Sequence, residues 1–185
     1  SKKPPSLDSL FPKIAAEKND SARYYLTMTA LTISETNPVE DMHNSEIILL
    51  HGQKNNDLVC QLLGYACLCY DYIAFGNKVK SLEFGIKANQ VAEKANDDRL
   101  KTFGKAMLAL TYLTMGDFEK SHPIYQELIS SDPKSTTVID SYGMSLLMSN
   151  NICDSVKLLK SAVKERNFTN VTLYNLGCAN QALGH

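Results

Sequence analysis

The chain has 185 residues, of which 44% are hydrophobic and 21% are charged, and its formal net charge at pH 7 is −1. This composition is typical of a globular protein, and the length suffices to bury a continuous core. No long run of one charge sign occurs, so electrostatics indicate neither nucleic acid nor an anionic membrane as a partner. No apolar stretch approaches the roughly 18 residues needed to span a bilayer.

The N-terminal part predicts a flexible lead at 1–5, a short helix at 6–18 and a longer helix at 21–36. Apolar side chains at helical spacing define the core-facing side of the longer helix. These side chains are Ala22, Tyr25, Leu26, Ala30 and Ile33.

Asn37-Pro38 predicts the start of the next helix, because Asn suits the N-cap and Pro the first helical position. This helix is expected to stop near Gly52. The two helices form a pair over residues 21–55, which we interpret as a degenerate first repeat.

Helical patterns continue to the end of the chain, and no strand-like alternation is long enough to compete. The sequence therefore predicts an all-α fold. The further expected helices are 57–75, 78–95, 99–115, 118–131, 136–149, 152–166 and 171–183.

Turn residues in the C-terminal half recur at a fixed interval. Gly116, Asn150 and Gly184 follow one another 34 residues apart, and Gly76 lies 40 residues before Gly116. An interval of about 34 residues is typical of helix-turn-helix units stacked into a solenoid.

Small residues recur in phase with these turns, as a close crossing of paired helices requires. They occupy one position on the first helix of each pair and one on the second. The first set is Cys69, Ala109, Gly143 and Gly177, and the second is Ser81, Ser121 and Ser155.

Together with Tyr72, Tyr112, Asp132-Pro133 and Met115-Gly116-Asp117-Phe118, this pattern resembles the tetratricopeptide repeat family. The resemblance implies a right-handed superhelical solenoid of antiparallel helix pairs, forming one domain over 6–185. It also implies a non-catalytic, protein-binding scaffold. The implied repeats are 21–55, 57–96, 99–133 and 136–168, with a half repeat at 170–185.

In that family the first helix of each pair lines an inner groove. Transferred by register, this predicts an apolar and aromatic groove that binds a protein or peptide with apolar anchors. Tyr70, Phe103 and Tyr174 are the expected hot spots, and Asp140 is the only expected carboxylate. The alternative is that much of the set packs against neighbouring helices. The predicted groove residues are Leu63, Tyr70, Ile73, Phe103, Leu110, Asp140, Met144, Leu147 and Tyr174.

No motif indicates catalysis. Phosphate-binding glycine loops, zinc-protease motifs and nucleophile elbows are absent from the sequence, so we expect no enzyme activity, cofactor or catalytic residue. The cysteines share no metal-ligand spacing, which favours small buried hydrophobic residues over a metal site. They are Cys60, Cys67, Cys69, Cys153 and Cys178.

Three N-terminal motifs resemble the opening of the repeat-containing sensor region of certain bacterial regulators. They are Leu7-Asp8-Ser9-Leu10-Phe11, Glu17-Lys18-Asn19-Asp20-Ser21-Ala22-Arg23 and Asn37-Pro38. This resemblance implies a sensory solenoid on the periplasmic side, joined through a membrane span outside this segment to a histidine-kinase or DNA-binding domain. The alternatives are a stand-alone cytosolic adaptor, which five cysteines favour, and a non-catalytic region of a multidomain enzyme.

The last expected helix is apolar on more than one side. Val171, Leu173, Tyr174, Leu176 and Cys178 carry this character. A natural capping helix has a polar outer face, so we expect the native protein to continue beyond His185. The alternative is self-association through this helix.

Overall fold

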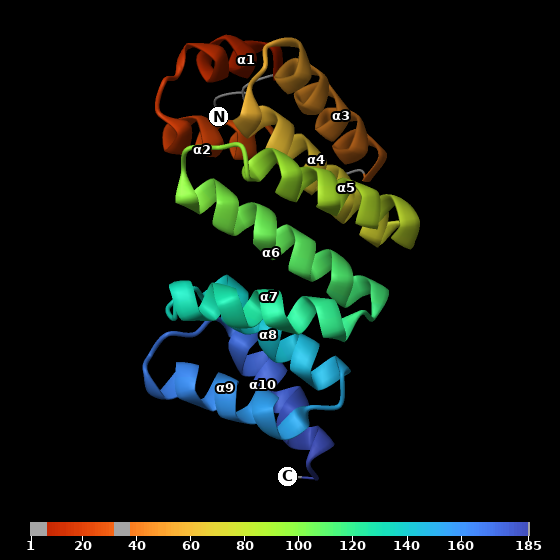
Figure 1. Cartoon of the computed structure of the whole chain (residues 1–185), viewed down its shortest axis with the longest axis vertical. Coiled ribbons are helices and arrows are strands. Elements are labelled where there is room, and N and C mark those ends of the chain that lie inside the picture. Colours follow the sequence, from red (N-terminus) through yellow and green to blue (C-terminus); the bar gives the residue numbers. More distant parts are fainter. Residues whose placement is uncertain (1–6, 32–37, 185) are drawn as a thin grey trace, which may run out of the picture. The chain divides into compact units, whose positions relative to one another are not determined.

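The computed structural model describes residues 7–31 and 38–184, and within these ranges it contains ten α-helices and no strand (Figure 1). The predicted all-α fold is therefore confirmed. No helix in these ranges has the length and apolar character required to cross a membrane. The helices are α1 Leu7–Ala16, α2 Asp20–Leu31, α3 Pro38–Lys54, α4 Leu58–Ala74, α5 Lys78–Ala92, α6 Asp98–Met115, α7 Phe118–Ser131, α8 Thr136–Met148, α9 Ile152–Lys164 and α10 Asn170–Ala182.

The chain divides into two compact units, Ser1–Leu108 and Ala109–His185, and the division falls within α6. In the first unit α4 packs against both α3 and α5. In the second unit α8, α9 and α10 pack against one another. The expected lead at 1–5 and the expected N-cap Asn37 lie outside the described residues.

The turn residues that define the 34-residue interval all adopt left-handed backbone conformations. Their φ angles are 71° at Gly76, 78° at Gly116, 63° at Asn150 and 81° at Gly184. After the first three turns, the next amide donates to a carbonyl in the last turn of the preceding helix, as in a Schellman motif. These bonds are Asn77 N to Tyr72 O at 2.8 Å, Asp117 N to Tyr112 O at 2.9 Å and Asn151 N to Leu146 O at 2.8 Å. The predicted positions of the turns are confirmed.

Gly52 does not end a helix. α3 continues through it and ends two residues later at Lys54, so the helix does end near Gly52 as predicted, although not at the glycine itself. A Cβ atom at this position would lie 2.6 Å from the backbone nitrogen of Gln61. The glycine instead permits α3 and α4 to approach closely.

The buried side of α2 also differs from the prediction. Leu26 packs against the core cluster of Leu10, Ile14, Ile48 and Cys60 in the first unit. Thr27 is fully buried, and its Oγ1 donates to the Arg23 carbonyl at 2.8 Å, which satisfies the hydroxyl away from water. Tyr25 is 70% exposed, so its assignment to the core is wrong. Thr27, rather than Tyr25, therefore faces the core. Ile33, the last residue of the predicted face, lies outside the described residues.

The predicted small residues are buried at helix contacts with the exception of Gly177, for which the prediction is wrong. Ser81, Ser121 and Ser155 are fully buried. Ser155 Oγ donates to the Gly143 carbonyl at 2.8 Å, joining α9 to α8. Gly177, at the corresponding position on α10, is exposed.

Asp140 on α8 holds the N-terminal end of α10. The hydroxyl of Thr169, the N-cap of α10, donates to one carboxylate oxygen at 2.6 Å, and the hydroxyl of Thr172 donates to the other. Asn175 Nδ2 donates to the Asp140 carbonyl at 3.0 Å. Both carboxylate oxygens are therefore used inside the second unit.

All five cysteines lie in the described part of the chain and are free thiols. Cys60 and Cys69 are fully buried, as expected for small hydrophobic residues in helix packing. Cys153 is exposed, so the same expectation is wrong for this residue.

Candidate functional site

The predicted groove residues of the first unit differ in accessibility. Tyr70 on α4 is 51% exposed, whereas Ile73 on α4 and Phe103 on α6 are half-buried. Leu63 is 0% exposed. A partner cannot reach Leu63, because α4 directs this side chain into the core, and it is removed from the candidate site.

In the second unit Tyr174 on α10 is 67% exposed. Leu110, Met144 and Leu147 are half-buried. Asp140 is 8% exposed and is bound by Thr169 and Thr172. Asp140 is therefore a structural residue, which corrects the expectation that it faces a partner.

Phe103 contacts Tyr24, which in turn contacts Tyr25. The groove prediction omitted both tyrosines. The ring of Tyr24 lies edge-to-face with the rings of Tyr25 and Phe103, with centroid distances of 5.8 Å in both pairs. This geometry is favourable for aromatic pairs. The sequence signal was the adjacent Tyr24-Tyr25 pair in the first helix of the degenerate repeat.

Tyr70 and Cys67 extend this aromatic group onto α4. Burial raises the pKa of Tyr24, and the nearby Cys67 and Tyr25 raise it further. Burial likewise raises the pKa of Tyr70, followed by the effects of Cys69, Cys67 and Tyr24. Both phenols are therefore protonated at neutral pH and can donate hydrogen bonds. We define the Tyr24 surface as Tyr24, Tyr25, Cys67, Tyr70 and Phe103.

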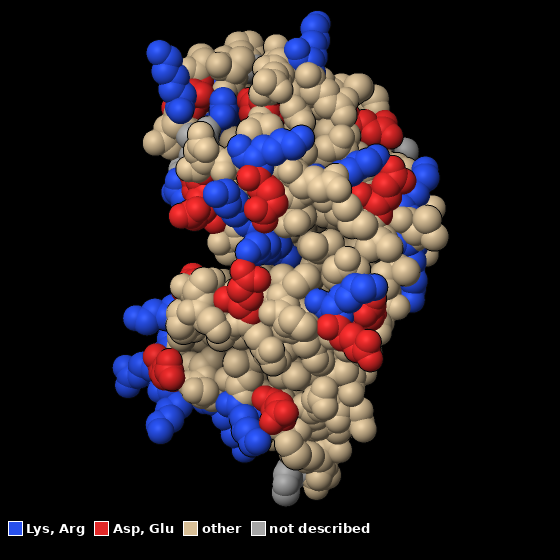
Figure 2. All heavy atoms as spheres, viewed as in Figure 1, with Lys and Arg blue, Asp and Glu red and all other residues tan. Residues whose placement is uncertain are grey.

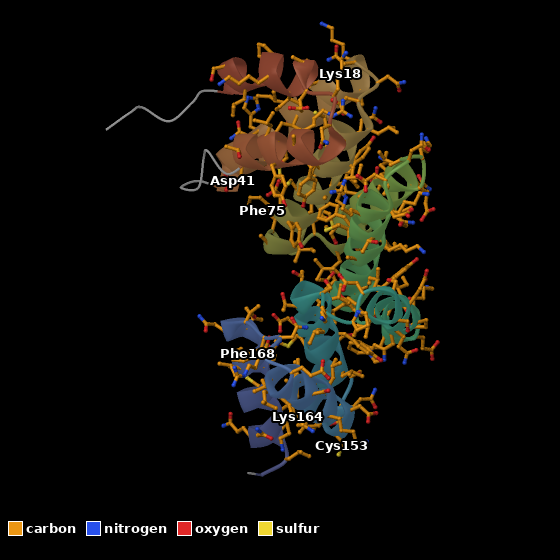
Figure 3. All side chains as sticks on the ribbon, turned by 90° about the vertical axis from the view of Figure 1, so that its left-hand side faces the viewer. Lys18, Asp41, Phe75, Cys153, Lys164 and Phe168 are labelled. Atoms are coloured by element: carbon orange, nitrogen blue, oxygen red, sulfur yellow. The ribbon has the colours of Figure 1, made fainter. Side chains whose placement is uncertain are left out.

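An acidic edge, consisting of Asp41 and Asp71, adjoins the Tyr24 surface. Asp71 lies one helical turn after Cys67 on α4 and accepts a hydrogen bond from Ser45 Oγ on α3 at 3.0 Å. Burial raises the pKa of the Asp71 carboxyl, the Ser45 hydrogen bond lowers it, and Asp41 raises it. In Figure 3 the labelled Asp41 and Phe75 lie along the same side of the first unit.

Cys67 interacts electrostatically both with Tyr24 and with the acidic edge. Burial, followed by the effects of Asp71, Cys69 and Asp41, raises the pKa of its thiol to about 12. The thiol is thus protonated and a poor nucleophile. In residues 7–31 and 38–184, no group of three or more His, Cys, Asp or Glu side chains could hold a metal ion.

A second candidate in the first unit is a cavity of about 410 Å³ lined by Arg23, His51, Asn55, Asp57, Lys94 and Asn96, among others. Arg23 lies 3.6 Å from the carboxylate of Asp57. The same carboxylate caps α4 by accepting the amides of Val59 and Cys60. Arg23 and Asp57 are therefore paired within the fold and do not require a ligand in the cavity. We favour the Tyr24 surface as the candidate site.

The surface charges are mixed on the face shown in Figure 2. Figure 2 shows acidic and basic side chains interspersed over the face in view of each unit. This face therefore lacks the basic stripe that nucleic-acid binding requires.

No family model, curated protein or solved structure matches this chain. The likeness to tetratricopeptide repeats accordingly depends on the residues, the turn geometry and the helix contacts described above.

Proposed function

We propose that the chain is a non-catalytic scaffold that binds a peptide segment of another protein on the Tyr24 surface. The observation that carries this proposal is the convergence of aromatic side chains from α2, α4 and α6 within one unit. Tyr25 and Tyr70 remain 70% and 51% exposed there. Exposed aromatic residues supported by further aromatic rings are typical of binding hot spots.

The chemistry of the surface suits a peptide. Tyrosine rings give a large contact area with few rotatable bonds, so little entropy is lost on binding. The protonated phenols of Tyr24 and Tyr70 can donate hydrogen bonds to peptide carbonyl groups. Half-buried Phe103 supports Tyr24 from α6.

We further propose that the scaffold is of the tetratricopeptide-repeat type. The left-handed turns at Gly116, Asn150 and Gly184, 34 residues apart, support this assignment. The buried serines at the helix crossings support it as well. The role as an input region of a bacterial regulator, and the periplasmic location, stay predictions from the N-terminal motifs.

The test is the affinity for peptides selected on the chain from a displayed random library. We expect Tyr70→Ala or Phe103→Ala to weaken binding by about 1–3 kcal/mol, or roughly five- to 150-fold, in fluorescence anisotropy. Circular dichroism should show an unchanged helix content for both variants. Tyr174→Ala, which removes an exposed tyrosine from the second unit, should leave the affinity unchanged. A loss of binding in Tyr174→Ala alone would move the site to the second unit.

A further inference from the structure

We infer that the peptide bound on the Tyr24 surface presents a Lys or Arg side chain to Asp71, with the aliphatic part of that side chain lying on the neighbouring rings. This inference rests on the proposed function and specifies the chemistry of the partner.

Tyr70 and the acidic edge meet on one face of α4. Tyr70 and Asp71 follow Cys67 by three and four residues, so both side chains adjoin that of Cys67 on this face. The electrostatic effects of Cys67 on Tyr70 and of Asp71 on Cys67 agree with this placement. We therefore expect a single long side chain to touch Tyr70 and reach the carboxylate of Asp71.

Asp71 has no cationic partner among the residues that the structure describes. Of the Lys, Arg and His side chains in the described ranges, none lies within 4.0 Å of its carboxylate, which receives only the Ser45 hydroxyl. Other acids of the chain have such a partner. These pairs are Arg23–Asp57, Arg99–Asp97, Lys120–Asp117 and Lys157–Asp154.

The half-buried position of Asp71 makes the lack of a cationic partner unfavourable. The residue is half-buried, and burial disfavours its charged form. A bound cation would supply the missing opposite charge, whereas a purely apolar side chain would remove more water from the carboxylate without compensation. An acidic peptide would be repelled by Asp71.

The aromatic neighbours favour the same partner. The chain itself places lysines over tyrosine rings: Lys80 Nζ lies 4.7 Å from the ring centroid of Tyr72, and Lys120 Nζ lies 5.3 Å from that of Tyr112. Such contacts are attractive because the ring face is electron-rich. Lys and Arg also cover apolar surface with their aliphatic stems while the charged group remains in a polar environment.

The experiment compares three labelled peptide pools that share randomised apolar flanks and differ at one central position, which is Arg, Gln or Glu. Fluorescence anisotropy measures their binding to the whole chain. We expect the Arg pool to bind about tenfold more tightly than the Gln pool, as a charge-assisted hydrogen bond would produce, and the Glu pool to bind most weakly. Added salt should reduce the preference for Arg.

Asp71→Asn should abolish the preference for Arg over Gln, because it removes the charge while Asn can still accept the hydrogen bond from Ser45. Asp98→Asn, which removes the same charge from an exposed carboxylate of the first unit, should keep the preference. Equal binding of the Arg and Gln pools to the unaltered chain would overturn the cation inference but leave the scaffold proposal standing. Failure of every pool to bind, or binding that Tyr70→Ala does not weaken, would overturn both.

Discussion

Asp71 is a residue whose local environment opposes its charge. Burial, and then the proximity of Asp41, raise its pKa above the ordinary 3.8, and the Ser45 hydrogen bond only partly offsets them. Folding therefore favours the protonated acid relative to the unfolded chain. The folded state loses stability as the pH rises through the raised pKa. A residue that reduces stability in this way is a reasonable candidate for a binding role.

This argument predicts the effect of neutralising Asp71. At pH 7 we expect Asp71→Asn to unfold at a higher urea concentration than the unaltered chain. The difference should fade as the pH falls through the raised pKa of Asp71, because the unaltered chain is then also neutral there. Urea titrations followed by circular dichroism at several pH values measure this, with Asp98→Asn as the control. A less stable Asp71→Asn at pH 7 would show that the carboxylate is stabilised by more than Ser45.

Part of the candidate site could be predicted from individual residues. The register predicted Tyr70 and Phe103, of which the structure leaves Tyr70 exposed and Phe103 half-buried. The burial of Leu63 and Asp140 could not be predicted, since it depends on packing partners in other helices. Asp140 is bound by Thr169 and Thr172, which lie 29 and 32 residues further along the chain. No local pattern indicates such a contact.

At the scale of helices, local signals predicted most boundaries. The left-handed residues Gly76, Gly116 and Asn150 end helices through backbone bonds within a few residues of sequence. Asn77 and Asp117 then accept amides at the starts of α5 and α7. The predictions that differ from the structure depend on tertiary contacts. Gly52 lies two residues before the end of α3 and admits α4 instead of ending the helix itself, and the buried face of α2 depends on how neighbouring helices orient it.

The packing of α9 on α8 predicts opposite effects for two equivalent glycines. A Cβ atom on Gly143 would lie 2.7 Å from Leu159 Cδ2 and 3.0 Å from Leu159 Cγ, whereas one on Gly177 would meet no atom within 4 Å. Leu159 is fully buried and belongs to the core cluster with Ile139 and Ala162. We expect Gly143→Ala to lower the free energy of unfolding by about 1–2 kcal/mol through overpacking. Gly177→Ala should raise it by about 0.5–1 kcal/mol, because alanine favours a helix over glycine.

Thermal and urea denaturation of the two variants measure these changes under identical conditions. Each variant adds one methyl group in the middle of a helix, so each is a control for the other. Equal stabilisation by both would show that α9 can shift away from Gly143 at little cost. Destabilisation by Gly177→Ala would show that another surface covers this position in solution.

At the scale of the whole chain, the helix contacts are local in sequence. In the described ranges, most helix contacts join neighbours or next-but-one helices along the chain, such as α3 with α4 or α8 with α10, whereas the contact of Tyr24 on α2 with Phe103 on α6 spans a longer stretch of sequence. Stability in such a chain is approximately a sum of local terms, as in repeat proteins. The division into two compact units at residues 108 and 109 is consistent with this behaviour.

We therefore expect the two units to open separately in native-state hydrogen exchange. Leu63→Ala removes a fully buried side chain from the first unit and should reduce amide protection in α3 and α4 by about 2–5 kcal/mol. The amides of α8 and α9 should keep their protection in this variant. Gly143→Ala should produce the reverse pattern, because its contact with Leu159 lies in the second unit. A uniform loss of protection over both units in either variant would show instead that the chain unfolds as one cooperative structure.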